Sequence, residues 1–91
     1  MPHAADKDNL SIKKKRISFR CWHRGTREMD LLLGRFADAE VEKMSEKELD
    51  LFEDFLNNSD PDIYNWVSGQ EPFPASEENE LTKRLIIFYL K

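Results

Sequence analysis

The sequence lacks several features that would each indicate a particular class of protein. Its 91 residues include one cysteine, Cys21, so an intramolecular disulfide is excluded. One cysteine and two scattered histidines are also too few for a zinc site. No apolar run approaches the ~20 residues that a membrane-spanning helix requires. The first ten residues include Asp6 and Asp8, which is atypical of secretory or mitochondrial targeting peptides. These absences predict a cytoplasmic protein without membrane insertion.

The sequence also has few of the residue patterns that enzymes use. Its three glycines are far apart, which excludes a glycine-rich phosphate loop. No serine or cysteine stands in a local pattern with a histidine that would activate it as a nucleophile. Glu28 and Asp30 are too close in sequence to face each other across a substrate. We therefore expect no catalytic residue and no enzymatic activity.

Charge is distributed unevenly along the chain, which has a net charge of −4. Residues 1–35 contain nine Lys and Arg against four Asp and Glu, and residues 36–91 contain five against fourteen. This asymmetry suggests a charged partner. The basic run Lys13–Arg16 is interpreted as a solvated helix face, with binding to nucleic acid or an acidic protein as the alternative. The acidic remainder would repel a phosphate backbone, so we expect no nucleic-acid partner.

Apolar and capping patterns predict an all-α fold in one small domain. Residues 1–8 are polar and are predicted to be a disordered N-terminal tail, so the domain covers residues 9–91. We expect a compact bundle of five short helices. The helices are predicted to begin at Asn9 or Ser11, at about Thr26, at the capping box that Ser45 opens, at Ser59–Asp62 and near Ser76.

Some positions within these helices predict their packing. The periodic residues of the second helix form one apolar face. Gly34 lies within that helix at a cost of about 1 kcal/mol relative to alanine, which indicates close packing by a neighbouring helix or a bend. Apolar positions are expected in the second helix at Met29, Leu32, Leu33 and Phe36, and in the first helix at Leu10, Ile17 and Cys21, with Phe19 and Trp22 as further candidates.

The stretch Trp22–Asp30 joins the first two predicted helices and concentrates charge. We expect His23 and Arg24 in the last turn of the first helix, with Gly25 as the residue just after its end. If Gly25 also caps the second helix, Glu28 occupies the third helical position, where a carboxylate interacts favourably with the helix dipole. The residues alone leave open whether this joint is a capped corner or a docking surface.

The joint and a later segment together resemble a known family. Arg24–Glu28 resembles the RGxxE signature of the SdhE-type FAD assembly factors of succinate dehydrogenase, and the similarity continues into Met29–Leu31. Asp60–Trp66 is similar to the acidic DPD-x-aromatic-Asn-Trp segment of the same family. The resemblance covers roughly residues 14–89. The amino-acid sequence of the first motif is most like that of an α-proteobacterial member.

The resemblance implies a function through a partner protein. Members of this family bind the flavoprotein subunit of succinate dehydrogenase, and in some bacteria that of fumarate reductase. They promote covalent attachment of FAD to a histidine of that subunit, so His23 is not expected to be the flavin ligand. The resemblance also implies that this chain is a non-catalytic assembly factor without a tightly bound cofactor. We expect the chain to be a monomer when free. The alternative is an antitoxin-like or nucleic-acid-associated regulatory protein.

The resemblance assigns partner contacts to the two motifs. Within the second motif, contact and packing both stay open, and packing is favoured for Trp66. Arg16 is included because it would widen the basic surface toward Arg24, whereas Arg20 is expected to be solvated. The expected partner-binding residues are Arg16, Arg24, Gly25, Arg27, Glu28, Asp30, Asp60, Pro61, Asp62 and Trp66.

Overall fold

The computed structural model describes the backbone of residues 2–90 and the side chains of residues 9–90. Residues 2–90 form five α-helices and two short 3₁₀ turns, with no strand among them. This confirms the predicted all-α, five-helix fold. The helices are α1 (Pro2–Trp22), α2 (Arg27–Glu40), α3 (Glu46–Phe55), α4 (Asp60–Val67) and α5 (Glu80–Leu90), and the turns are η1 (Val41–Lys43) and η2 (Ala75–Glu77).

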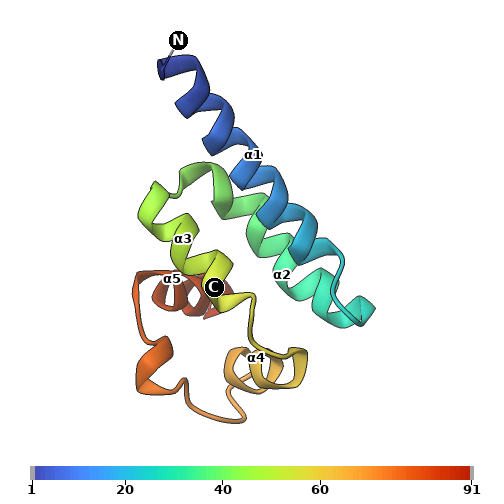
Figure 1. The fold of residues 1–91 in the computed structure, drawn as a ribbon. Coiled ribbons are helices and arrows are strands. Elements are labelled where there is room, and N and C mark those ends of the chain that lie inside the picture. The colour runs from blue at the N-terminus through green and yellow to red at the C-terminus, as the bar shows by residue number, and fades with distance from the viewer. Residues whose placement is uncertain (1, 91) are drawn as a thin grey trace.

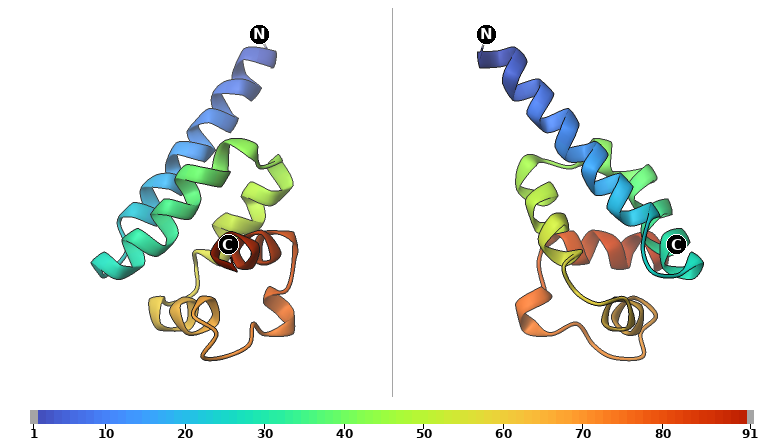
Figure 2. Two further views of the ribbon diagram at one scale, coloured as in Figure 1. Left: turned by 180° about the vertical axis from the view of Figure 1, so that it is seen from behind. Right: turned by 45° about the vertical axis from the view of Figure 1, so that its right-hand side comes forward.

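The helices pack as a bundle that is longer in one direction than in the other two. The long helices α1 and α2 lie side by side and run in opposite directions (Figure 1). Helix α3 packs against α1 on one side and α5 on another, and the short α4 lies at the end of the molecule where α1 turns into α2 (Figure 2). The first turns of α1 project beyond the other helices, and the molecule measures 48 × 26 × 24 Å.

Helix α1 begins earlier than its sequence predicts. The prediction placed the start at Asn9 or Ser11, whereas the helix starts at Pro2. Proline is compatible with the start of a helix because its missing N–H would have no intrahelical partner there. Met1 and the side chains of residues 2–8 lie outside the described part of the chain, so the disorder of the 1–8 tail stays a prediction.

The core forms where the apolar faces of all five helices meet. Phe36 is fully buried and makes edge-to-face contacts with Phe52 and Phe88, at ring-centroid distances of 5.4 and 5.5 Å. Ile17 and Cys21 are buried as predicted, but Phe19 is 63% exposed, so its assignment to the core is wrong. Phe19 lies two positions from each of these buried residues, which places it on the other side of the helix.

Gly34 is explained by the close approach of α1 to α2. A Cβ atom built on Gly34 would lie 2.3 Å from Cδ2 of Trp22, so the indole ring occupies the space that a side chain would need. The Trp22 indole N–H also donates to Asp38 Oδ1 at 3.1 Å, which fixes the ring across α2. The predicted close packing at this glycine is therefore confirmed.

The basic run of α1 is paired with acidic residues of the same chain. The Nζ atoms of Lys13 and Lys14 interact with Asp50 and with Glu42, respectively. Two further hydrogen bonds join Arg16 to α3: its Nε donates to Glu53 Oε2 at 2.6 Å and its Nη2 to Oε1 at 3.1 Å. The interpretation of the lysines as a solvated face is therefore wrong for Lys13 and Lys14, which are half-buried, whereas Arg16 is exposed although it is paired.

Capping explains the starts of α3 and α5. The predicted capping box is present at Ser45 and Glu48, each of which accepts a hydrogen bond from the backbone N–H of the other. Helix α5 starts at Glu80 rather than near Ser76, because Asn79 Oδ1 accepts from the N–H groups of Leu81 and Thr82. Pro74 precedes the η2 turn, which contains Ser76.

The packing of Trp22 on Gly34 predicts that alanine at this position destabilises the protein. Alanine gains about 1 kcal/mol in helix propensity, but overpacking costs about 1–3 kcal/mol. We therefore expect Gly34→Ala to lower the free energy of unfolding by about 1 kcal/mol in urea denaturation followed by circular dichroism. In a Trp22→Ala background the same substitution should stabilise. Stabilisation in both backgrounds would contradict the assigned clash.

The pairing of α1 with α3 predicts a pH-dependent contribution to stability. The hydrogen bonds from Arg16 are the main cause that lowers the pKa of Glu53 below its ordinary value. A lowered folded-state pKa stabilises the fold above the unfolded pKa of ~4.3 and loses that effect as the pH falls through the lowered value. Glu53→Gln should therefore destabilise at pH 7, and the difference from wild type should shrink at acidic pH. A difference that is constant with pH, or equal to that of Asp54→Asn, would refute this.

Candidate functional site

Four residues, 23–26, form the joint between α1 and α2. The N-cap of α2 is Thr26, whose Oγ1 accepts from the N–H of Met29 at 3.2 Å. Glu28 is therefore the second residue of the helix rather than the third, and the predicted capping role of Gly25 is wrong. His23 and Arg24 follow the end of α1 instead of lying in its last turn. Gly25 has no positive φ, so its conformation is not that of a helix-ending glycine.

The Arg24 side chain fastens this joint to the turn between α3 and α4. Its Nε donates to Asp60 Oδ1 at 2.7 Å. Its Nη1 and Nη2 donate to the carbonyl oxygens of Leu56 and Asn58 at 2.9 and 3.0 Å. The side chain is only 12% exposed. The guanidinium thus satisfies two carbonyl groups in the turn that follows α3 and one carboxylate at the start of α4.

Asp60 links the two sequence motifs directly. One carboxylate oxygen accepts from Arg24, and the other accepts from the backbone N–H of Gly25 at 3.0 Å. A Cβ atom on Gly25 would lie 3.0 Å from the same oxygen, closer than nine in ten real Cβ contacts. A larger residue at this position would therefore require the carboxylate to shift by a few tenths of an ångström. Sequence reasoning missed this pairing, and the opposite charges of Arg24 and Asp60 were its only signal.

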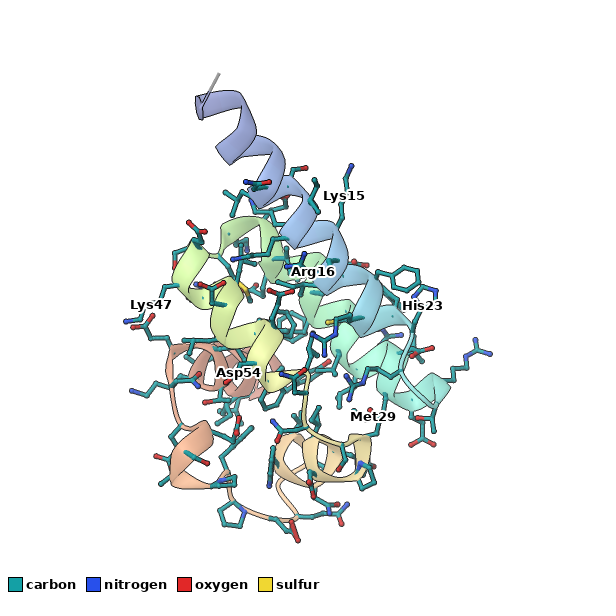
Figure 3. The ribbon with its side chains drawn as sticks, in the orientation of Figure 1. Lys15, Arg16, His23, Met29, Lys47 and Asp54 are labelled. Atoms are coloured by element: carbon teal, nitrogen blue, oxygen red, sulfur yellow. The ribbon has the colours of Figure 1, made fainter. Side chains whose placement is uncertain are left out.

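Two further contacts hold the joint in shape. The backbone N–H of Arg24 donates to Asp30 Oδ1 at 2.5 Å, so this half-buried carboxylate is used within the fold. The His23 ring stacks on Phe19 with a centroid distance of 3.9 Å and an interplanar angle of 16°. His23 Nδ1 lies 2.8 Å from the carbonyl oxygen of Phe19, which fits an N–H donor at this nitrogen. Figure 3 shows His23 at the end of α1.

Four other motif residues face solvent. Arg27, Glu28, Pro61 and Asp62 are all exposed. The side chains of Arg27, Glu28 and Asp62 make no hydrogen bond or ion pair with any residue in the range 9–90. We call the surface formed by Gly25–Glu28 and Pro61–Asp62 the joint edge. It is one part of the two motifs that is available to another molecule.

The other predicted site residues lie apart from the joint edge. Arg16 is bound to Glu53 on α3. Arg20 donates to the Glu53 carbonyl at 3.3 Å and to Asn57 Oδ1 at 3.0 Å, so its expected solvation is wrong. Trp66 packs against the core beside Phe55 and Phe73, which confirms the packing interpretation. A partner contact through Arg16 or Trp66 stays a prediction.

Three observations concern the chemistry that the described residues can support. Burial raises the pKa of the Cys21 thiol to about 12, so Cys21 is not a thiolate nucleophile at neutral pH. Within the described residues, no group of three or more His, Cys, Asp or Glu could hold a metal ion. No helix in the described part of the chain has the length and apolar character to cross a bilayer.

Comparison with known proteins identifies relatives over most of the chain. A family model described as "Flavinator of succinate dehydrogenase" matches residues 15–88. The FAD assembly factor SdhE of Acetobacter pasteurianus is 35% identical over 79 residues, which are 87% of this chain and 72% of that protein. The protein of the same name from Legionella pneumophila (strain Paris) is 37% identical over 59 residues, 65% of this chain and 73% of that protein.

Mitochondrial relatives are longer. Succinate dehydrogenase assembly factor 2 of Komagataella phaffii is 37% identical over 78 residues, which are 85% of this chain but 41% of that protein. The homologous protein of Dictyostelium discoideum is 36% identical over 70 residues, 77% of this chain and 50% of its own length. This chain thus spans half or less of the length of these two mitochondrial relatives.

The contacts of Asp60 predict that it stabilises the fold far more than its neighbour Asp62. Removing the Asp60 carboxylate leaves the Arg24 guanidinium, 12% exposed, without its anion. We expect Asp60→Ala to lower the free energy of unfolding by about 2–3 kcal/mol. Asp62→Ala removes an exposed acid from the same helix turn and should cost about 0.5 kcal/mol. Chemical denaturation of both variants measures the difference, and equal losses would mean that the ion pair is not what stabilises the joint.

Proposed function

Because this chain belongs to the family of flavinators of succinate dehydrogenase, we propose that it binds the flavoprotein subunit of succinate dehydrogenase and promotes covalent attachment of FAD to it. The proposal is supported by the family match and by relatives named FAD assembly factor and succinate dehydrogenase assembly factor. In this proposal FAD is the cargo of the partner, and the chain acts as an assembly factor rather than an enzyme.

The observation that carries the proposal is a fixed backbone beneath exposed, unpaired charges. Arg24 and Asp60 hold the joint from inside the fold. Arg27 and Glu28 follow directly on the outside, at the start of α2. A surface whose backbone is already ordered loses less conformational entropy when a partner binds. The joint edge therefore fits a docking role better than the role of a helix corner alone.

We infer that the chain acts by positioning. When it is docked, it holds the flavoprotein in an arrangement in which FAD and the acceptor histidine are aligned, and such alignment lowers a barrier by several kcal/mol. The acceptor histidine belongs to the flavoprotein, since His23 of this chain is stacked on Phe19. A proton-transfer role for Glu28 is the second candidate, because its carboxylate is exposed.

The internal ion pairs change which charges are available for docking. The sequence predicts a basic surface that includes Arg16 and Arg24 and meets a charged partner. Arg16 and Arg24 are bound to Glu53 and Asp60, so they contribute little to an outward positive field. The unpaired charges of the joint edge are of both signs, which favours a partner surface that also carries both.

Several finer points stay predictions within this proposal. They are that fumarate reductase is also a client, that the free protein is a monomer without tightly bound FAD, and that it acts in the cytoplasm. The alternative of a nucleic-acid-associated regulator loses its main support, because much of the basic run is neutralised by α3 and η1.

Glu28 provides the test of this proposal. We expect Glu28→Ala, coexpressed with the flavoprotein subunit, to reduce covalent flavin by about tenfold or more, because a misplaced partner loses alignment. In-gel flavin fluorescence measures the product. Stability should fall by only about 0.5 kcal/mol, since the side chain is exposed and unpaired and interacts only with the helix dipole. The matched control is Glu78→Ala, which removes an exposed acid far along the chain.

Two further outcomes are informative. Normal flavinylation by Glu28→Ala together with a lower melting temperature would show that Glu28 only stabilises the corner, and the docking role would then be wrong. Glu28→Gln keeps the size and hydrogen-bonding capacity of the side chain but cannot accept a proton. If it binds the flavoprotein normally and still fails in flavinylation, Glu28 has the proton-transfer role instead of the docking role.

A further inference from the structure

A shallow groove runs between the first turn of α2 and the exposed face of α4. Its volume is about 340 Å³, and its bottom includes Met29, which is 3% exposed. Figure 3 labels Met29 at the start of α2, on the side where α4 lies. The lining residues are Thr26, Glu28, Met29, Asp60, Pro61, Tyr64 and Asn65.

One wall of the groove is a continuous stripe of α4. Pro61, Tyr64 and Asn65 are spaced at i, i+3 and i+4, which places them on one face of the helix. Tyr64 is 39% exposed although it is a large aromatic residue. Its ring gives the groove apolar surface that is open to solvent, whereas Met29 lines the groove but is nearly fully buried. Such a surface suits an apolar side chain of a partner.

The charge of the groove is negative at its rim. Two carboxylates line it, and Asp60 is neutralised by Arg24. Glu28 is exposed and makes no ion pair with the residues described. Asp62 adds an exposed carboxylate next to Pro61. The two helix N-termini contribute only about half a positive charge each, and caps at Thr26 and Ser59 already occupy one N–H of each helix.

Arg27 does not cancel this rim charge within the groove. It is not among the lining residues, whereas its neighbour Glu28 is. Consecutive residues of a helix project about 100° apart, so the two side chains leave α2 in different directions. The groove itself therefore combines an apolar interior with an unpaired carboxylate, a combination that selects an apolar side chain accompanied by a cation.

We propose that this groove is the socket for a segment of the flavoprotein subunit that presents an apolar side chain next to a lysine or arginine. The apolar side chain contacts Met29 and Tyr64, and the cation pairs with Glu28. This inference rests on the proposed function and adds to it the chemistry of the recognised segment. It also separates the motif residues into those that shape the socket from behind, such as Arg24, and those that touch the partner.

Site-specific photocrosslinking in the flavoprotein complex tests the socket. A benzophenone amino acid in place of Tyr64 should crosslink to the flavoprotein subunit. Mass spectrometry should map the crosslink to a peptide with an apolar residue beside a lysine or arginine. The matched control carries the same probe at Ile87 on α5, which is 58% exposed and does not line the groove. The control should give no crosslink to that peptide.

Binding measurements test the charge. We expect Glu28→Lys to weaken binding of the purified flavoprotein subunit by about tenfold at low salt, because it places like charges together. Added salt should reduce the difference from wild type. Tyr64→Ala should also weaken binding, but with little dependence on salt. The control Asp54→Lys makes the same charge change on α3, outside the groove, and should bind nearly as wild type does.

The outcomes separate the socket from the proposed function. If wild-type protein does not bind the flavoprotein at all, the proposed function fails. If wild type binds while Tyr64→Ala and Glu28→Lys bind equally well and the Tyr64 probe gives no crosslink, only the socket is wrong. A crosslink to a second copy of this chain, or to a flavoprotein peptide without a cation, would also overturn the proposed occupant.

Discussion

The carboxylate of Asp60 is the centre on which the rest of the site depends. One oxygen receives the Arg24 guanidinium and the other receives the Gly25 amide, so a single side chain from α4 fixes the direction in which the chain leaves α1. Arg24 extends this connection to the carbonyls at the end of α3. Four helices therefore meet through one ion pair, and α2 starts from a fixed position. The exposure of Arg27 and Glu28 is a consequence of this arrangement.

The uneven charge of the chain has the same kind of explanation. A basic front and an acidic back suggest an external partner, but α1 finds much of its counter-charge on η1 and α3, through Lys13, Lys14 and Arg16. Pairs of this kind on a surface contribute little stability each, although several along one helix interface favour one packing of α1 over others. The net charge of a segment therefore indicates a charged partner only after the ion pairs within the chain have been considered.

Local signals in the sequence predicted those features that depend on nearby residues. The capping box at Ser45 and the apolar face of α2 are examples, because their partners lie within one or two turns. The pairing of Arg24 with Asp60 joins residues 36 positions apart, and no local pattern selects one acid among 18. The start of α5 and the exposure of Phe19 were predicted wrongly for a different reason, because the Asn79 cap and the helical spacing of Phe19 from Ile17 and Cys21 are local signals that the prediction did not use. The resemblance to a family located the site, but only the structure divided its residues into inward and outward members.

This division affects how the motif should be interpreted. A partner-binding motif is often interpreted as a set of contact residues. The side chains of Arg24 and Asp60, however, form their hydrogen bonds within the fold. A 91-residue chain buries only a modest core, so it has few other means to hold an exposed turn rigid. The inward residues Arg24 and Asp60 hold the backbone of the outward residues in place. Under the proposed docking role, loss of function in an Arg24 or Asp60 variant would report the displacement of the joint edge, whereas loss in a variant of an outward residue would report lost contact.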